Sequence, residues 1–309
     1  MKQPSAEAAP DGFSADWLSL REPFDFEARN VAARRMRWVE RLERWRSGST
    51  HPWRVIDLGC GTGSNLRWLA PWLEGAQQWL AVDHDAALLN AWPSVFESTG
   101  APLMDGAHDL TRVARWPLPS ASVEIVRRQL DLAQHLEALP WSAADLVTAS
   151  ALIDLVGPVW LKQLVACCSA ARAGLLLTLS VDGRLRWHPA DRDDIWMSHT
   201  FAAHQQRDKG FGPALGARAV PVLVRLLRQA GYRVMQARSD WQVDGRADPR
   251  GQALMGAMVD GLAEAVREQL PASTERVSAW HARRMARAPQ ARLMVGHIDV
   301  LALPPARSG

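Results

Sequence analysis

An apolar run that ends in an acid and then passes through alternating glycines constrains this chain more than any other stretch. It is VIDLGCGTGSNLRWLAP, residues 55–71. Its first four residues predict a short buried strand, and apolar residues then recur at helical spacing, at Leu66, Leu69, Ala70 and Leu73. The glycines between them permit positive φ and let a ligand approach the main chain. Such a strand–turn–helix lies at the carboxyl end of a parallel sheet, where open α/β folds bind nucleotides.

A second acid follows about twenty residues after the glycines, the interval seen in nucleotide-binding α/β folds. Residues 79–82 predict another apolar strand, and it ends in Asp83. A carboxylate at the tip of this strand can accept two hydrogen bonds from a ribose diol. The alternative is that Asp83 caps the helix that follows, since aspartate is a favourable N-cap residue.

These two features resemble the Rossmann-like methyltransferases that use S-adenosylmethionine (SAM). Their first motif is acid-x-Gly-x-Gly-x-Gly, which Asp57, Gly59, Gly61 and Gly63 match. The dinucleotide fingerprint differs, because its third glycine would fall at Ser64. The alternative is an ordinary glycine-rich turn. The resemblance implies an α/β fold of three layers around a seven-stranded, mostly parallel sheet whose last strand is antiparallel.

The resemblance also implies which residues would contact SAM. In similar enzymes an acid after the third strand bonds the adenine amino group, with an apolar neighbour under the ring; Asp131 and Leu132 occupy these places. The alternative is that Asp131 only caps the following helix. The full set of expected cofactor contacts is Asp57, Gly59, Gly61, Gly63, Asp83, His84, Asp131, Leu132 and Ser150.

The expected reaction is transfer of the methyl group of SAM to a small-molecule acceptor by in-line displacement. Asp154 follows the fourth strand and would serve as a base, a partner for a substrate amine or an N-cap. A polar loop after the fifth strand holds His204 and Asp208, and it would be either a recognition surface or a solvated insertion. The candidate catalytic residues are therefore His204, Asp154 and Asp208. No metal-ligand spacing is present, so no metal is expected.

The chain divides into three parts. Residues 1–14 are expected to be a disordered tail. Residues 15–50 predict an amphipathic helix, either a lid over the cofactor with Arg21 and Asp25 as its contacts, or a helix packed against the sheet edge. Residues 51–309 form the methyltransferase domain, with insertions at about 92–120, 184–216 and 248–287, the last as two helices split at Pro271.

Net charge, the length of apolar runs and the number of cysteines indicate which kinds of partner and which compartment to expect. A net charge of +3 does not require a nucleic-acid partner, so binding of nucleic acid is not expected. No apolar run approaches a membrane span, and three cysteines cannot form a disulfide framework, which favours the cytoplasm. Two other functions remain open: methylation of RNA or protein, supported by the basic N-terminal helix, and SAM binding without catalysis.

Overall fold

The computed structural model describes residues 13–100, 102–208 and 210–305. Nearly all of the tail expected at residues 1–14 lies outside these ranges. The strands of the described residues form one sheet in the order β3-β4-β2-β1-β5-β6-β9-β7, and β8 pairs with β9. Their bounds are β1 Trp53–Leu58, β2 Gly75–Asp83, β3 Ala114–Leu118, β4 Ala121–Gln129, β5 Leu146–Ser150, β6 Gly174–His188, β7 Arg233–Arg238, β8 Trp241–Asp244 and β9 Arg292–Leu303.

The sheet is mostly parallel, as expected. Strands β4, β2, β1, β5 and β6 run parallel to one another, whereas β3 runs antiparallel to β4, and β9 runs antiparallel to β6, β7 and β8. The predicted fold class is therefore confirmed, but the described residues form nine strands where seven were expected, because β3 adds a strand beside β4 and the chain breaks between β7 and β8. Residues 232–241, whose composition predicts a single strand, contribute to two strands, because the chain breaks between β7 and β8. Both pair with the same edge of β9, which is long enough to take them in succession.

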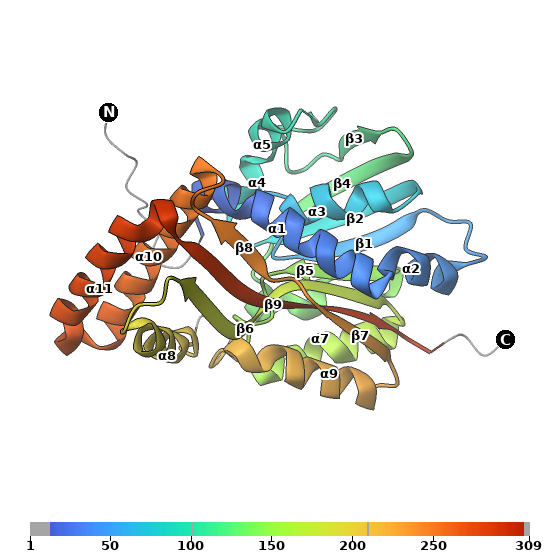
Figure 1. The fold of residues 1–309 in the computed structure, drawn as a ribbon. Helices are drawn as coiled ribbons and strands as arrows, with labels where there is room; N and C mark the ends of the chain where they lie inside the picture. The colour runs from blue at the N-terminus through green and yellow to red at the C-terminus, as the bar shows by residue number, and fades with distance from the viewer. Residues whose placement is uncertain (1–12, 101, 209, 306–309) are drawn as a thin grey trace.

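Helices cover both faces of this sheet (Figure 1). The apolar cluster on one face includes residues of α2 Trp38–Arg46, α3 Ser64–Leu69 and α5 Trp92–Ser98. The other face carries α7 Pro158–Ala171 and α9 Ala219–Gln229. The strands between them are near-continuous apolar runs, which is the pattern of strands covered on both faces. No helix within the described ranges is long and apolar enough to cross a bilayer.

The predicted N-terminal helix is two helices. The first, α1 Ala15–Met36, lies across the sheet and ends where Arg37 adopts left-handed backbone angles, with φ of 48°. The second, α2, begins at the next residue. A prediction of one continuous helix was wrong here, because a left-handed residue interrupts the hydrogen-bond ladder while the apolar spacing continues.

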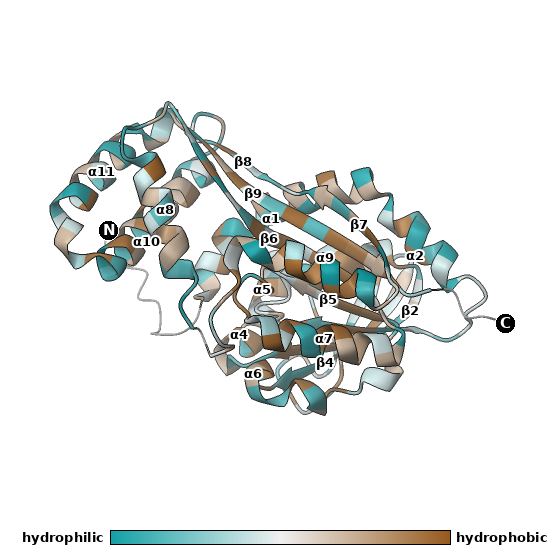
Figure 2. Ribbon diagram, turned by 90° about the horizontal axis from the view of Figure 1, so that it is seen from below, coloured by the Kyte–Doolittle hydropathy of each residue, from teal (hydrophilic) through white to brown (hydrophobic). Residues whose placement is uncertain are grey.

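Three helices form a separate body at the end of the sheet where β6 stops and β9 starts (Figures 1 and 2). We call α8 Asp194–Gln205, α10 Pro249–Gln269 and α11 Thr274–Arg287 the helical cap. They share one apolar cluster with residues of β8 and β9. The predicted division of the last insertion into two helices is confirmed, because a short 3-10 turn from Pro271 to Ser273 separates α10 from α11.

Candidate functional site

The glycine turn, residues 59–63, connects β1 to α3 and is closely packed. Gly59, Gly61 and Gly63 all have positive φ, at 63°, 51° and 84°. A Cβ at Gly63 would lie 2.9 Å from the ring of Trp92, and one at Gly61 would lie 3.0 Å from Leu18 of α1. Side chains are therefore excluded both by backbone angle and by space. The turn has a fixed shape with α1 above it.

Asp83 lies at the end of β2 and faces this turn. Its Oδ2 accepts a hydrogen bond from the Gly61 amide at 2.7 Å, and its Oδ1 accepts one from the Asp85 amide at 3.0 Å. Helix α4, Ala86–Asn90, is capped by Asp85 and not by Asp83, so the capping alternative for Asp83 is wrong. A carboxylate oxygen can accept two hydrogen bonds, so both oxygens retain capacity for a diol.

His84, Asp131 and Leu132, the other residues expected to contact the cofactor near Asp83, differ in their surroundings. His84 lies beside Asp83, with its Nδ1 3.3 Å from Oδ1, and this contact raises the pKa of His84. Strand β4 ends at Gln129, before Asp131. The Oδ1 of Asp131 accepts from the Ala133 amide at 2.8 Å and caps α6 Leu132–His135. The capping role of Asp131 is confirmed; its contact with adenine stays a prediction, with buried Leu132 beside it.

Asp57 is completely buried within β1. Its Oδ1 accepts from Nδ2 of Asn65 at 2.8 Å, and the same amide nitrogen lies 3.0 Å from Oγ1 of Thr148. Its Oδ2 has no hydrogen-bond partner among the described residues. Burial raises the pKa of Asp57 to about 7. The first acid of the motif is thus a carboxyl group with one unused oxygen.

Helix α1 brings a buried arginine to the same place. The guanidinium of Arg29 donates to Oγ of Ser64 at 3.0 Å, to Oδ1 of Asn65 at 3.2 Å and to the carbonyl of Asp25 at 3.2 Å. Its side chain is completely buried, and burial lowers its pKa. The sequence prediction missed this residue. Its signal was an arginine among the alanines and Met36 that form the buried face of α1.

Arg21 and Asp25, which were expected as lid contacts, pack against β8 and not against the glycine turn. Arg21 and Asp25 form a buried ion pair at 2.9 Å, and Nε1 of Trp241 in β8 donates to Asp25 at 2.9 Å. The contacts of α1 with the glycine turn come instead from Leu18, and from Glu22, which pairs with Arg67 of α3 at 2.6 Å. Helix α1 thus spans the turn and the far strands. Its role as a lid stays a prediction.

The three candidate catalytic residues lie in different surroundings. Asp154 is buried in the turn that follows β5, whose last residue, Ser150, is half-buried. Asp208 is exposed, and its Oδ1 accepts from the amides of Gly210 and Gly212 in its own loop. Nε2 of His204 lies 2.9 Å from Glu268 of α10, within the helical cap. Of the three, Asp154 directly follows a parallel strand of the sheet.

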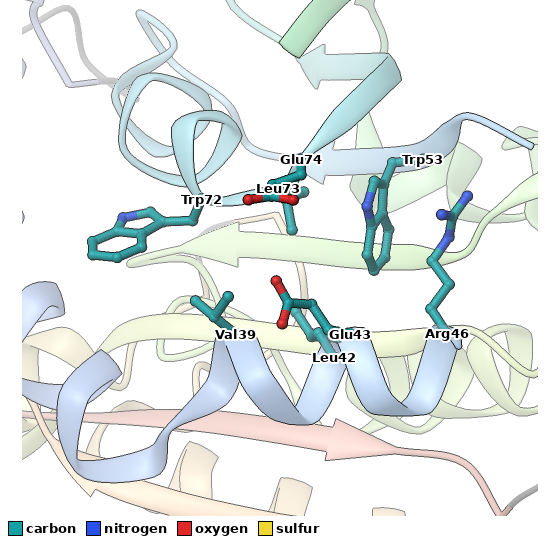
Figure 3. Close-up of a pocket in the computed structure, with 8 residues that line it drawn as sticks. All are labelled: Val39, Leu42, Glu43, Arg46, Trp53, Trp72, Leu73 and Glu74. Carbon is teal, nitrogen blue, oxygen red and sulfur yellow. The ribbon is translucent and has the colours of Figure 1, made fainter. Parts of the chain in front are cut away.

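A cavity of about 220 Å³ lies away from the glycine turn (Figure 3). It is bounded by Trp53 and Trp72 at its two ends and by Glu43 and Glu74 from below and above. Because Trp53 begins β1 and the glycine turn follows its last residue, the cavity lies at the opposite edge of the sheet. Within the described ranges, no group of three or more His, Cys, Asp and Glu is placed to hold a metal ion.

The position of β9, reversed between β6 and β7, decides the fold class. The fold is the Rossmann-like α/β fold that the sequence predicts. Searches of the sequence against protein-family models and against curated proteins found no match.

Solved structures similar to this chain include several enzymes. A cyclopropane-fatty-acyl-phospholipid synthase-like protein from Lactobacillus casei is 16% identical, covering 93% of this chain and 94% of its own, with a TM-score of 0.45. The cyclopropane synthase MmaA2 from Mycobacterium tuberculosis is 12% identical, over 93% and 94%, with a TM-score of 0.43. A phosphoethanolamine N-methyltransferase from Haemonchus contortus is 12% identical, over 85% and 52%, with a TM-score of 0.39. This chain spans about half the length of the last. At these values the likeness is one of fold only.

Proposed function

We propose that this chain binds SAM and transfers its methyl group to a small-molecule acceptor. The observation that carries the proposal is the carboxylate of Asp83, held against the glycine turn by the Gly61 amide with acceptor capacity left for a ribose diol. The fold places this pair at the carboxyl end of β1 and β2, where α/β sheets bind nucleosides.

The described residues fit the parts of SAM. Asp83 would hold the ribose, Leu132 and Asp131 would contact the adenine, and the glycine turn would accommodate the amino-acid end. The unused oxygen of Asp57 offers an acceptor for the ammonium group of that end. SAM itself supplies a methyl group already activated on a sulfonium.

The protein then has to align the acceptor with the methyl carbon and exclude water. Such alignment accounts for much of the acceleration of a displacement whose leaving group is already activated. An acceptor that must lose a proton needs a base, and Asp154, buried after β5, is our first candidate. His204 and Asp208 are retained as further candidates.

Calorimetry tests the binding step. The wild-type protein should bind SAM and S-adenosylhomocysteine. Asp83→Ala should weaken both by on the order of 100-fold, since hydrogen bonds to a charged group are lost. Asp85→Ala, which removes the cap of α4 but not the diol acceptor, is the matched control and should retain affinity. Unchanged affinity in Asp83→Ala would remove the ribose assignment.

A second experiment addresses the acceptor. Protein incubated with methyl-tritiated SAM and a cell extract should place the label in the low-molecular-mass fraction. Label in RNA or protein would instead support a macromolecular acceptor. Binding of SAM with no transfer to any fraction would leave a non-catalytic SAM-binding protein and contradict the proposed reaction.

A further inference from the structure

Arg29 is a buried cation that forms no ion pair with any residue that the structure describes, although the carboxylates of Asp25, Asp299 and Glu22 act on it from beyond 4.0 Å. Its side chain is completely buried, and its hydrogen bonds go to a hydroxyl, an amide oxygen and a backbone carbonyl. Among the residues that the structure describes, no carboxylate oxygen lies within 4.0 Å of its guanidinium. Burial of an unpaired charge is costly, because water no longer solvates it. Such a group is stabilised if a ligand supplies the anion.

Arg29 lies close to an acid, Asp57, that has one oxygen without a hydrogen-bond partner among the described residues. Ser64 and Asn65, the side-chain partners of Arg29, directly follow the glycine turn. Asn65 binds Arg29 through its oxygen and Asp57 through its nitrogen, and Oδ2 of Asp57 is without a partner. One amide therefore separates a cation from a carboxyl group, and both have bonding capacity left.

Two other buried arginines pair with carboxylates, whereas the buried Nε of Arg127 has no hydrogen-bond partner among the described residues. Arg67 pairs with Glu22, and Arg284 pairs with Asp194. Arg127 has no ion pair within the described ranges, but it donates to three backbone carbonyls, of Leu89, Gly106 and Ala107. Arg29 has one backbone carbonyl, and its other two acceptors are side chains that can rotate. The rings of Phe26 and Trp68 lie 5.3 and 5.1 Å from its guanidinium and hold it in place.

We infer that Arg29 binds the carboxylate of the amino-acid end of SAM while Asp57 accepts from its ammonium group. This inference rests on the proposed function. A free α-amino acid group carries a negative carboxylate and a positive ammonium on the same α-carbon, which matches the opposite charges of Arg29 and Asp57 on either side of Asn65. Charge-assisted pairs of this kind are short and strong when water is excluded. Because Arg29 belongs to α1, the same contact ties this helix to the bound cofactor.

A pair of ligands tests the inference without any mutation. SAM and decarboxylated SAM share the adenosyl, sulfonium and ammonium groups and differ in the carboxylate. Calorimetry on the wild-type protein should find decarboxylated SAM weaker by on the order of 10- to 100-fold. Equal affinities would overturn the role of Arg29 and leave the proposed function standing. Failure of both compounds to bind would instead refute the proposed function.

A substitution of Arg29 then tests whether its side chain causes the preference for SAM over decarboxylated SAM. Arg29→Gln should weaken SAM and leave decarboxylated SAM nearly unchanged, so that the ratio of the two affinities approaches one. Arg67→Gln is the matched control: it also loosens α1 from α3, but it should change both affinities together and keep the wild-type ratio. A wild-type ratio in folded Arg29→Gln would contradict the inference. If that variant does not fold, the wild-type ligand pair still decides.

Discussion

The glycine-turn region and the helical cap both bury charge, and they treat it in opposite ways. In the cap, Asp191 pairs with Arg283 at 2.8 Å, and Asp194 pairs with Arg284. Beside the glycine turn, Arg29 has no ion pair within the described ranges, and Asp57 has a buried oxygen without a partner. The difference separates charges that are paired within the protein from charges for which we propose a ligand as the partner.

The pKa values follow the same division. The Arg283 guanidinium holds the pKa of Asp191 well below its usual range, because the ion pair favours the charged carboxylate. Burial raises the pKa of Asp57 to about 7, because desolvation of the carboxylate outweighs the hydrogen bond from Asn65 and the positive charge of Arg29. An ion pair offsets part of the desolvation cost of its two charges, whereas an unpaired buried charge lacks that compensation.

The largest effect is expected in the cap. Arg284→Ala leaves the nearly buried Asp194 without its cation and should lower the free energy of unfolding by about 3–5 kcal/mol in urea titrations. Combining Arg284→Met with Asp194→Asn should recover much of the loss, because neither charge then remains. A loss under ~1 kcal/mol would show that the cap charges are not structural.

The next effect tests the unpaired acid beside the glycine turn. The pKa of Asp57 is higher in the folded state than its ordinary value of 3.8, so the folded protein binds the proton more tightly. Its contribution to stability is present below about pH 4 and is lost as pH rises through 7. Asp57→Asn should therefore stabilise the protein at pH 8 by on the order of 2–4 kcal/mol, with no gain near pH 4. A gain that does not vary with pH would contradict this assignment.

A smaller effect is expected where the glycine-turn region does contain an ion pair. Glu22→Gln removes the partly buried partner of Arg67 and should lower the free energy of unfolding by about 1–2 kcal/mol. If Arg29 binds the carboxylate of SAM and Arg67 serves only to hold α1 against α3, the preference for SAM over decarboxylated SAM should survive the substitution. Loss of that preference would show that the two arginines act as one unit.

The smallest effect is expected at His204. Its partner, Glu268, is exposed on α10, and solvent screens a pair of this kind. His204→Ala should leave the unfolding midpoint and the affinity for SAM unchanged within error. Once an acceptor is identified, a reduced turnover with unchanged SAM affinity would support His204 as a catalytic residue, and wild-type turnover would remove it.

The cofactor motif and the individual strands could be predicted because short segments of the sequence carry their patterns. Glycines at alternating positions and an acid after the next strand are patterns within short segments, and the arrangement of the sheet was implied by the family resemblance that these patterns carry. Asp131 shows where a short pattern is ambiguous, because the same carboxylate position suits a helix cap and a ligand. The break at Arg37 was missed because apolar spacing continues across it.

What the sequence by itself determined is the strand–turn–helix around Gly59, Gly61 and Gly63, because backbone angles and apolar periodicity are local properties. What only the tertiary structure decided is the state of the charges. Arg29 and Ser64 lie 35 positions apart in the chain and meet only when α1 packs over α3. Whether a buried charge has a counter-ion depends on such distant contacts, since desolvation and pairing are set by everything packed around it.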